Sequence, residues 1–148
     1  MVTGPEFLSF GSKPATWTKE EATAAVSWMA RGGTLVVFTD DSSSLTTVLG
    51  FDDIAPISKK ELVPADPTNI LTGVRRVESE SNFTFSQRPQ RAALLLRSSG
   101  KPVAWVARQG QGRLILVGSA AFCDNAHLAK ADNARLALTL VTAFAPEK

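Results

Sequence analysis

The most regular pattern of apolar positions lies between residues 18 and 33. Four residues recur at spacings of three and four and so share one face of a helix: Ala22, Ala25, Val26 and Met29. Thr18 and Glu21 have the spacing of a capping box, in which each side chain binds the backbone N–H of the other residue. Gly32 and Gly33 follow, and glycine suits the left-handed backbone of a helix C-terminus. The pattern predicts a helix over residues 19–31.

A continuously apolar run comes next. Residues 34–39 read Thr-Leu-Val-Val-Phe-Thr without polar alternation, which is typical of strands covered on both faces in parallel sheets. Residues 40–43 are polar and can cap a short helix over residues 44–49, which ends at Gly50. Strand, loop and helix in this order are typical of α/β folds. Residues 2–5 are predicted as a further strand.

Residues 51–91 lack a regular pattern, because prolines interrupt them at Pro56, Pro64, Pro67 and Pro89. Two short strands are predicted there, over residues 74–77 and 82–85. Three clearer strands follow, over residues 92–97, 102–108 and 113–118. The turns between these three are short enough to force antiparallel pairing.

An amphipathic helix closes the chain, with Asp132 at its N-cap position and an apolar face made of Ala134, Ala137, Leu138, Val141 and Phe144. Together the elements predict a single α/β domain over residues 1–148. Its central sheet is expected to be mostly parallel, with helices on both faces and an antiparallel extension.

Composition narrows the possible functions. Of the 148 residues, 44% are hydrophobic and 20% are charged, which is typical of a globular domain. Sixteen Lys and Arg against 14 Asp and Glu give a net charge of +2, which predicts no nucleic-acid partner. The chain contains no apolar run long enough for a membrane span, so this segment is not expected to insert into a membrane. One cysteine and one histidine exclude a disulfide framework and a four-cysteine zinc site, and we expect no metal or other cofactor.

Polar residues follow several predicted strands, where open α/β sheets bind their ligands. The predicted ligand-binding residues are Glu6, Asp40, Asp41, Ser119, Asn125, Asp132 and Asn133. The alternative interpretation is structural. Asp and Asn side chains cap helices and fix tight connections whether or not the loop binds anything.

Cys123 and His127 are the weaker candidates, for catalysis. On a helix, a spacing of four places a thiol and an imidazole on one face, and a cysteine nucleophile needs such a base. The alternative is that Cys123 is a buried apolar residue, since no strained glycine-flanked turn surrounds it.

Two further motifs have simpler interpretations. The Gly-Gln-Gly sequence at residues 110–112 leads into a strand rather than a helix, so we interpret it as a turn and not as a phosphate loop. Five arginines make the middle of the chain basic: Arg75, Arg76, Arg88, Arg91 and Arg97. No aromatic residues alternate with them, so a solvated face is the preferred interpretation.

Several segments together resemble one known family. They are residues 32–38, 70–74, 101–104, 110–119, Asn125 and residues 131–134. They are similar to a family of unknown function in the class I glutamine-amidotransferase-like superfamily, whose members are usually bacterial and membrane-anchored. The resemblance implies a flavodoxin-like fold and attachment of the parent protein to a membrane. Members usually carry an earlier strand and helix, which we expect to be missing from this chain.

The resemblance does not imply glutaminase chemistry, because residues 39–41 read Thr-Asp-Asp where the nucleophile elbow would carry a cysteine. Relatives are often encoded beside AAA-type ATPases and von Willebrand A-type proteins, which implies a membrane-associated assembly. The leading hypothesis is a non-catalytic binding or scaffolding domain, with a protein partner or a small ligand. The alternatives are a hydrolase or transferase that uses Cys123 and His127, and a domain that docks only to its own membrane segments.

Overall fold

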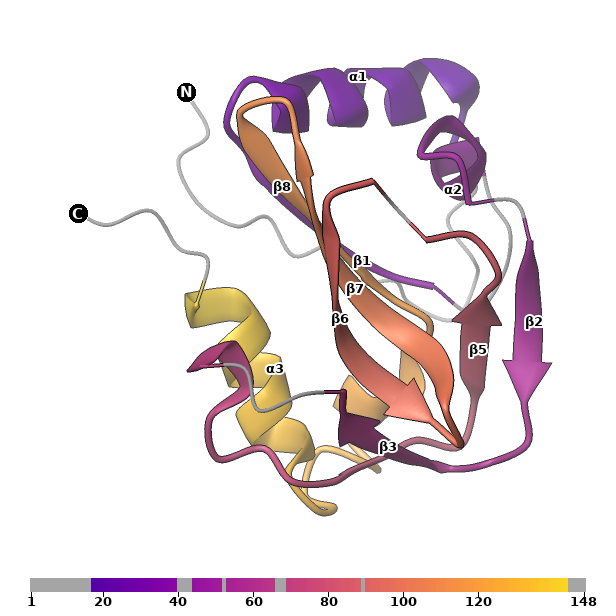
Figure 1. Ribbon diagram of the computed structural model, residues 1–148, viewed down its shortest axis with the longest axis vertical. Coiled ribbons are helices and arrows are strands. Elements are labelled where there is room, and N and C mark those ends of the chain that lie inside the picture. The colour runs from indigo at the N-terminus through magenta and orange to yellow at the C-terminus, as the bar shows by residue number, and fades with distance from the viewer. Residues whose placement is uncertain (1–16, 40–43, 52, 66–68, 89, 144–148) are drawn as a thin grey trace.

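The computed structural model describes residues 17–39, 44–51, 53–65, 69–88 and 90–143, and it places them in a curled mixed sheet with helices packed against it (Figure 1). The described helices are α1 (Lys19–Ala30), α2 (Ser44–Val48) and α3 (Asn133–Thr142). The described strands are β1 (Thr34–Phe38), β2 (Ile54–Ile57), β3 (Glu61–Pro64), β4 (Val77–Glu78), β5 (Asn82–Phe85), β6 (Ala92–Ser98), β7 (Lys101–Gln109) and β8 (Gly112–Val117).

The main sheet has the strand order β1-β8-β7-β6-β3-β4, and β2 pairs separately with β5. Only the pairing of β1 with β8 is parallel among the described strands; the remaining pairings are antiparallel. The expected fold class, a flavodoxin-like α/β fold with a mostly parallel sheet and helices on both faces, is therefore wrong. The described chain is instead rich in β-structure and forms a half-barrel.

The physical reason for this error lies in β8. Its apolar run is buried on both faces, as predicted, because alternate residues enter two separate apolar clusters. Ile115 and Val117 join the cluster that includes Leu136 of α3, whereas Leu114 and Leu116 join the one that contains Met29 of α1. Burial on both faces does not fix strand direction, and the tight turn at residues 109–112 makes β7 an antiparallel neighbour.

Most local elements follow the sequence prediction. The capping box of α1 is present, with the Thr18 N–H donating to Glu21 and the Glu21 N–H donating to Thr18. The predicted strand over residues 82–85 matches β5, whereas the strand predicted over residues 74–77 overlaps β4 only at Val77. The strand predicted over residues 2–5 lies outside the described residues.

The sequence pattern does not predict strands β2 and β3, because Pro56 and Pro64 indicate breaks there. Pro56 lies in β2, which pairs only with β5 among the described strands, and Pro64 ends β3. Proline is tolerated at such edge and terminal positions, where its missing N–H costs no ladder hydrogen bond. Separately, no helix in the described ranges is long and apolar enough to cross a membrane.

Glycines at the two ends of β8 allow backbone segments to approach it closely. A Cβ on Gly112 would collide with the carbonyl oxygens of Met29 and Gly33, and one on Gly118 would collide with that of Phe83. These approaches carry hydrogen bonds, from the Arg113 N–H to Gly33 and from the Phe83 N–H to Gly118. They fix the end of α1 at one end of β8 and the start of β5 at the other.

We therefore expect Gly112→Ala to destabilise the protein by roughly 2–4 kcal/mol, since backbone rather than a flexible side chain must move. Urea unfolding followed by circular dichroism measures the change. Gly100→Asn is the matched control, because nothing lies within 4 Å of a Cβ there and asparagine tolerates its φ of 79°. Equal losses in the two variants would contradict the steric explanation.

Candidate functional site

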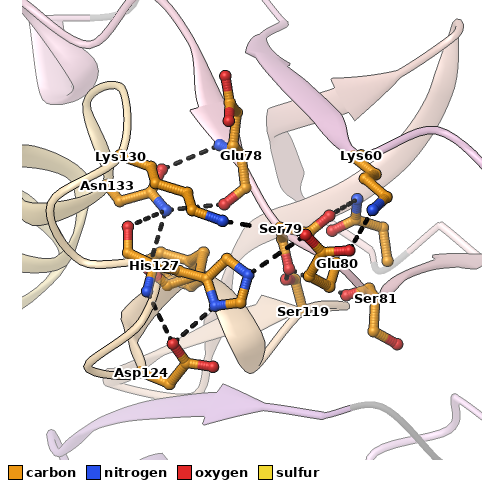
Figure 2. A network of polar contacts seen from close by, with 12 residues as sticks. Lys60, Glu78, Ser79, Glu80, Ser81, Ser119, Asp124, His127, Lys130 and Asn133 are labelled. Atoms are coloured by element: carbon orange, nitrogen blue, oxygen red, sulfur yellow. Dashed lines mark hydrogen bonds and ion pairs between the residues drawn. The ribbon is translucent and has the colours of Figure 1, made fainter.

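The predicted site residues that the structure describes gather in the β8–α3 connection, defined here as residues 118–132, and at the first residue of α3. This connection lies against residues 78–82, which contain the turn between β4 and β5 (Figure 2). Glu6, Asp40 and Asp41 lie outside the described residues, so the expected convergence of all the strand-end residues stays a prediction.

Asn133 is the centre of this arrangement and is fully buried. Its Nδ2 donates to the carbonyl oxygens of Glu78 at 2.7 Å, His127 at 2.9 Å and Phe122 at 3.0 Å. Its Oδ1 accepts from the Glu78 N–H at 2.9 Å, across 55 residues of sequence. The side-chain amide therefore pairs with β4 as a neighbouring strand would, and both of its hydrogens are engaged inside the protein.

Asp132 does not cap α3 with its side chain, although it occupies the N-cap position. Its Oδ2 instead accepts from the backbone N–H groups of Arg75 and Arg76, at 2.8 and 3.2 Å. These two hydrogen bonds stabilise the carboxylate and lower the pKa of Asp132. Asp132 thus joins the start of α3 to the loop that precedes β4.

Two buried serines make a second link. The Ser119 hydroxyl donates to the Ser79 hydroxyl at 2.6 Å, and both side chains are buried. Nearby, the side-chain amide of Asn82 donates to the carbonyl oxygens of Lys59 and Ser79. The predicted residue Ser119 is therefore engaged with the β4–β5 turn rather than exposed to a cleft.

His127 lies between two carboxylates (Figure 2). Its Nδ1 is 2.6 Å from Asp124 Oδ1, and the hydrogen bond from His127 is the main reason that the pKa of Asp124 is lowered. Its Nε2 is buried and faces Glu80 Oε1 at 3.6 Å. Glu80 also pairs with Lys60 and Lys130, and the Lys60 contact is the largest cause of its lowered pKa.

Sequence reasoning missed the residues on the opposite side of this network, namely Lys60, Ser79 and Glu80. They come from the middle of the chain, where the pattern is irregular. Nothing in the local sequence pairs Glu80 with His127, which lies 47 residues further on.

Cys123 has a different environment from the one that a nucleophile needs. It ends a short 3₁₀ helix, Ala121–Cys123, and the chain then continues through turns, so residues 123–127 do not form one continuous α-helix. The Sγ is half-buried and donates to the Ala120 carbonyl oxygen at 3.2 Å, while burial raises the pKa of the thiol. His127 directs its ring nitrogens to carboxylates instead.

The arrangement as a whole joins elements rather than presenting reactive groups. Hydrogen bonds to backbone groups engage the side chains of Asp132 and Asn133, and Ser119 is bonded to Ser79. Asn125 is exposed. Within the described ranges, no three His, Cys, Asp or Glu side chains are grouped closely enough to hold a metal ion. Asp132 and Asn133 therefore join the start of α3 to β4 and the loop before it, and their role in ligand binding stays a prediction.

Asn133→Ala should destabilise the protein by about 2–4 kcal/mol, because it leaves buried backbone groups of β4 and of the β8–α3 connection without partners. Asn125→Ala, at an exposed asparagine of the same connection, should cost less than about 0.5 kcal/mol. Chemical denaturation of the two variants beside the wild type makes this comparison. A similar small effect in both would refute the role given to Asn133.

Acid should weaken the fold through Asp132, Asp124 and Glu80. Each has a folded-state pKa below its ordinary value, so each stabilises the fold above that ordinary value. This contribution is lost as the pH falls from about 4 through the lower folded pKa. Urea midpoints measured from pH 7 to pH 2 should show this loss.

The variant Asp132→Asn keeps an acceptor oxygen for Arg75 and Arg76 but cannot titrate. Its stability should fall less steeply below about pH 4 than that of the wild type. Asp53→Asn, at an exposed carboxylate outside this network, is the control. Identical pH profiles for wild type and Asp132→Asn would show that these two hydrogen bonds do not stabilise the carboxylate.

Comparison with solved structures shows the fold alone, because the identities are low. A cytoplasmic protein of Salmonella typhimurium LT2, STM1381, is 12% identical with a TM-score of 0.66, over 84% of this chain and 60% of that one. The mmIFT52 N-terminal domain is 14% identical with a TM-score of 0.69, over 90% of this chain and 74% of that one. The chain thus spans less than two thirds of the STM1381 protein. No curated protein matches.

These findings correct the resemblance stated above. Membership of the class I glutamine-amidotransferase-like superfamily is wrong, because neither the matching family nor these neighbours point to it, and the described sheet is mixed rather than flavodoxin-like. The expectation of a family of unknown function is confirmed. The sequence model described as Domain of unknown function (DUF4350) matches residues 7–141, and the chain belongs to that family.

Proposed function

We propose that this chain is a non-catalytic binding domain. The observation that carries the proposal is the internal engagement of the polar groups that follow β8. The Asn133 amide, the Asp132 carboxylate and the Ser119 hydroxyl all bond to other parts of the domain. A catalytic centre keeps at least one such group directed at a substrate, whereas these groups hold β4, β5 and α3 together.

The state of the thiol supports the same conclusion. A cysteine nucleophile works as a thiolate, so catalytic sites lower its pKa by means of a nearby cation or a helix N-terminus. Burial raises the pKa of Cys123, and the charge of the neighbouring Asp124 raises it further. The side chain packs against the apolar cluster that includes Phe122 and Leu136. Its environment is that of a core residue.

The proposal includes the expected setting of the domain. Its partner would be a protein of a membrane-associated assembly or a small ligand, and its parent protein would be attached to a membrane. Both statements stay predictions from the sequence. A binding domain requires a rigid scaffold more than reactive groups, and the connections between distant segments described above supply one.

Alkylation of Cys123 by iodoacetamide, in folded and in urea-denatured protein from pH 5 to 9, tests the absence of catalysis. We expect slower labelling in the folded protein at every pH, with a midpoint above the ordinary thiol value of about 8.5. His127→Gln should not slow the reaction, because the imidazole does not activate the thiol. Cys123→Ser is the control for labelling elsewhere.

Two results would overturn the proposal in favour of a cysteine-dependent hydrolase or transferase. One is rapid labelling of the folded protein with a midpoint well below that of a free thiol. The other is a marked slowing of that labelling in His127→Gln, with the variant still folded by circular dichroism. Either result requires a thiolate–imidazole pair that the contacts of Cys123 and His127 do not contain.

A further inference from the structure

A hollow of about 530 Å³ lies where three segments of the chain meet. One segment follows α2, the second joins β5 to β6, and the third is the end of β7. The lining residues are Leu49, Gly50, Phe51, Gln87, Arg88, Gln90, Arg91, Arg108 and Gln109. Its volume is in the range of small-molecule sites.

The charged lining of this hollow is entirely basic within the described residues. Arg88, Arg91 and Arg108 contribute three guanidinium groups, and no described lining residue is acidic. None of the three forms an ion pair with a carboxylate in the described part of the chain. The ion pairs present there involve other cations, such as Lys60 and Arg76. The hollow therefore concentrates positive charge that no carboxylate of the described residues neutralises.

The strand register brings two of these arginines close to each other. Ala92, the first residue of β6, pairs with Ala107 of β7, so Arg91 just before β6 lies near the end of β7 that carries Arg108. Arg91 also has a φ of 52°, a left-handed backbone that a long side chain rarely adopts. Unfavourable features of this kind concentrate at binding sites.

Arg88 is held in place by contacts of its own. Its guanidinium lies over the Trp105 ring, 5.7 Å from the centroid, and its Nη2 donates to the Ala92 carbonyl oxygen at 3.2 Å. A guanidinium fixed on an aromatic face loses less side-chain entropy when it binds an anion. The remaining N–H groups of Arg88 stay available to a ligand.

We infer that this hollow binds the phosphate group of a phosphorylated ligand, through Arg88, Arg91 and Arg108. Guanidinium groups match phosphate oxygens in pairs, and a phosphate monoester carries about −1.5 to −2 charges to set against the three arginines. Gln87, Gln90 and Gln109 supply amide donors around them. The inference rests on the proposed function, since it names a ligand class for a binding domain.

Phosphate of this kind has two sources, a free small molecule or the headgroup of an anionic lipid. Isothermal titration calorimetry at low salt with pyrophosphate and with glycerol 3-phosphate tests the first. Co-sedimentation with phosphatidylcholine vesicles containing about 20% phosphatidic acid tests the second. We expect binding in at least one arm, and Arg91→Gln and Arg108→Gln should each weaken it by about tenfold or more.

Arg97→Gln is the matched control, because Arg97 is an exposed arginine of β6 that does not line the hollow. It should bind as the wild type does. Without ligand, the melting temperatures of Arg91→Gln and Arg108→Gln should stay close to that of the wild type, since both side chains are exposed. Such melting temperatures would show that the variants lose binding without losing the fold.

Three outcomes would overturn the inference. They are no binding in either arm, an equal loss in Arg97→Gln, and equally tight binding of citrate, which would make the hollow a general anion or carboxylate site. A fourth outcome, an acidic peptide that binds where the phosphate probes do not, would have the same effect. Because Cys123 takes no part in this test, failure here is distinct from failure of the alkylation test.

Discussion

The rest of this fold depends on close backbone contact at both ends of β8. Gly112 lies under the end of α1, and Gly118 lies against the Phe83 carbonyl at the start of β5. Between them, β8 forms the single parallel pairing of the described sheet with β1 and an antiparallel pairing with β7. A side chain at Gly112 would push the end of α1 away from β8, and one at Gly118 would push the start of β5 away from it. The position of β8 therefore determines where the β8–α3 connection leaves the sheet.

That connection leaves a buried strand, and several of its own residues are buried, among them Ser119, Phe122 and His127. Buried backbone N–H and C=O groups need partners, and an irregular connection cannot supply them by itself. Asn133 meets this need, because one amide can donate to several carbonyl oxygens while it accepts from the Glu78 N–H. Asp132 does the same for the loop before β4. The need for hydrogen-bond partners thus accounts for Asp132 and Asn133 at the end of this connection.

The sequence was informative where the interactions are local. The capping box at Thr18 and Glu21 involves residues three apart, and the short turn at residues 109–112 determines how β7 and β8 pair. It was misleading where the outcome depends on distant partners. An apolar strand is compatible with parallel or antiparallel neighbours, and the partner of Asn133 lies 55 residues away. Cys123 and His127 have a suggestive spacing, but the turns after residue 123 and the carboxylates beside His127 decide their roles.

The arginines of the hollow also could not be singled out from the sequence, because contacts between distant segments bring them together. Along the sequence, Arg88 and Arg91 are two basic residues in an irregular segment, and a net charge of +2 gives no reason to single them out. The pairing of β6 with β7 adds Arg108 to them, and the packing of Arg88 on Trp105 fixes one guanidinium. Elsewhere, Lys60, Lys130 and Arg76 are matched by Glu80, Glu78 or Glu61. Described carboxylates thus neutralise the cations near β4 but not the three arginines beside β6 and β7. This difference in charge distinguishes the polar network around Asn133, which stabilises the fold, from the hollow that we propose as a binding site.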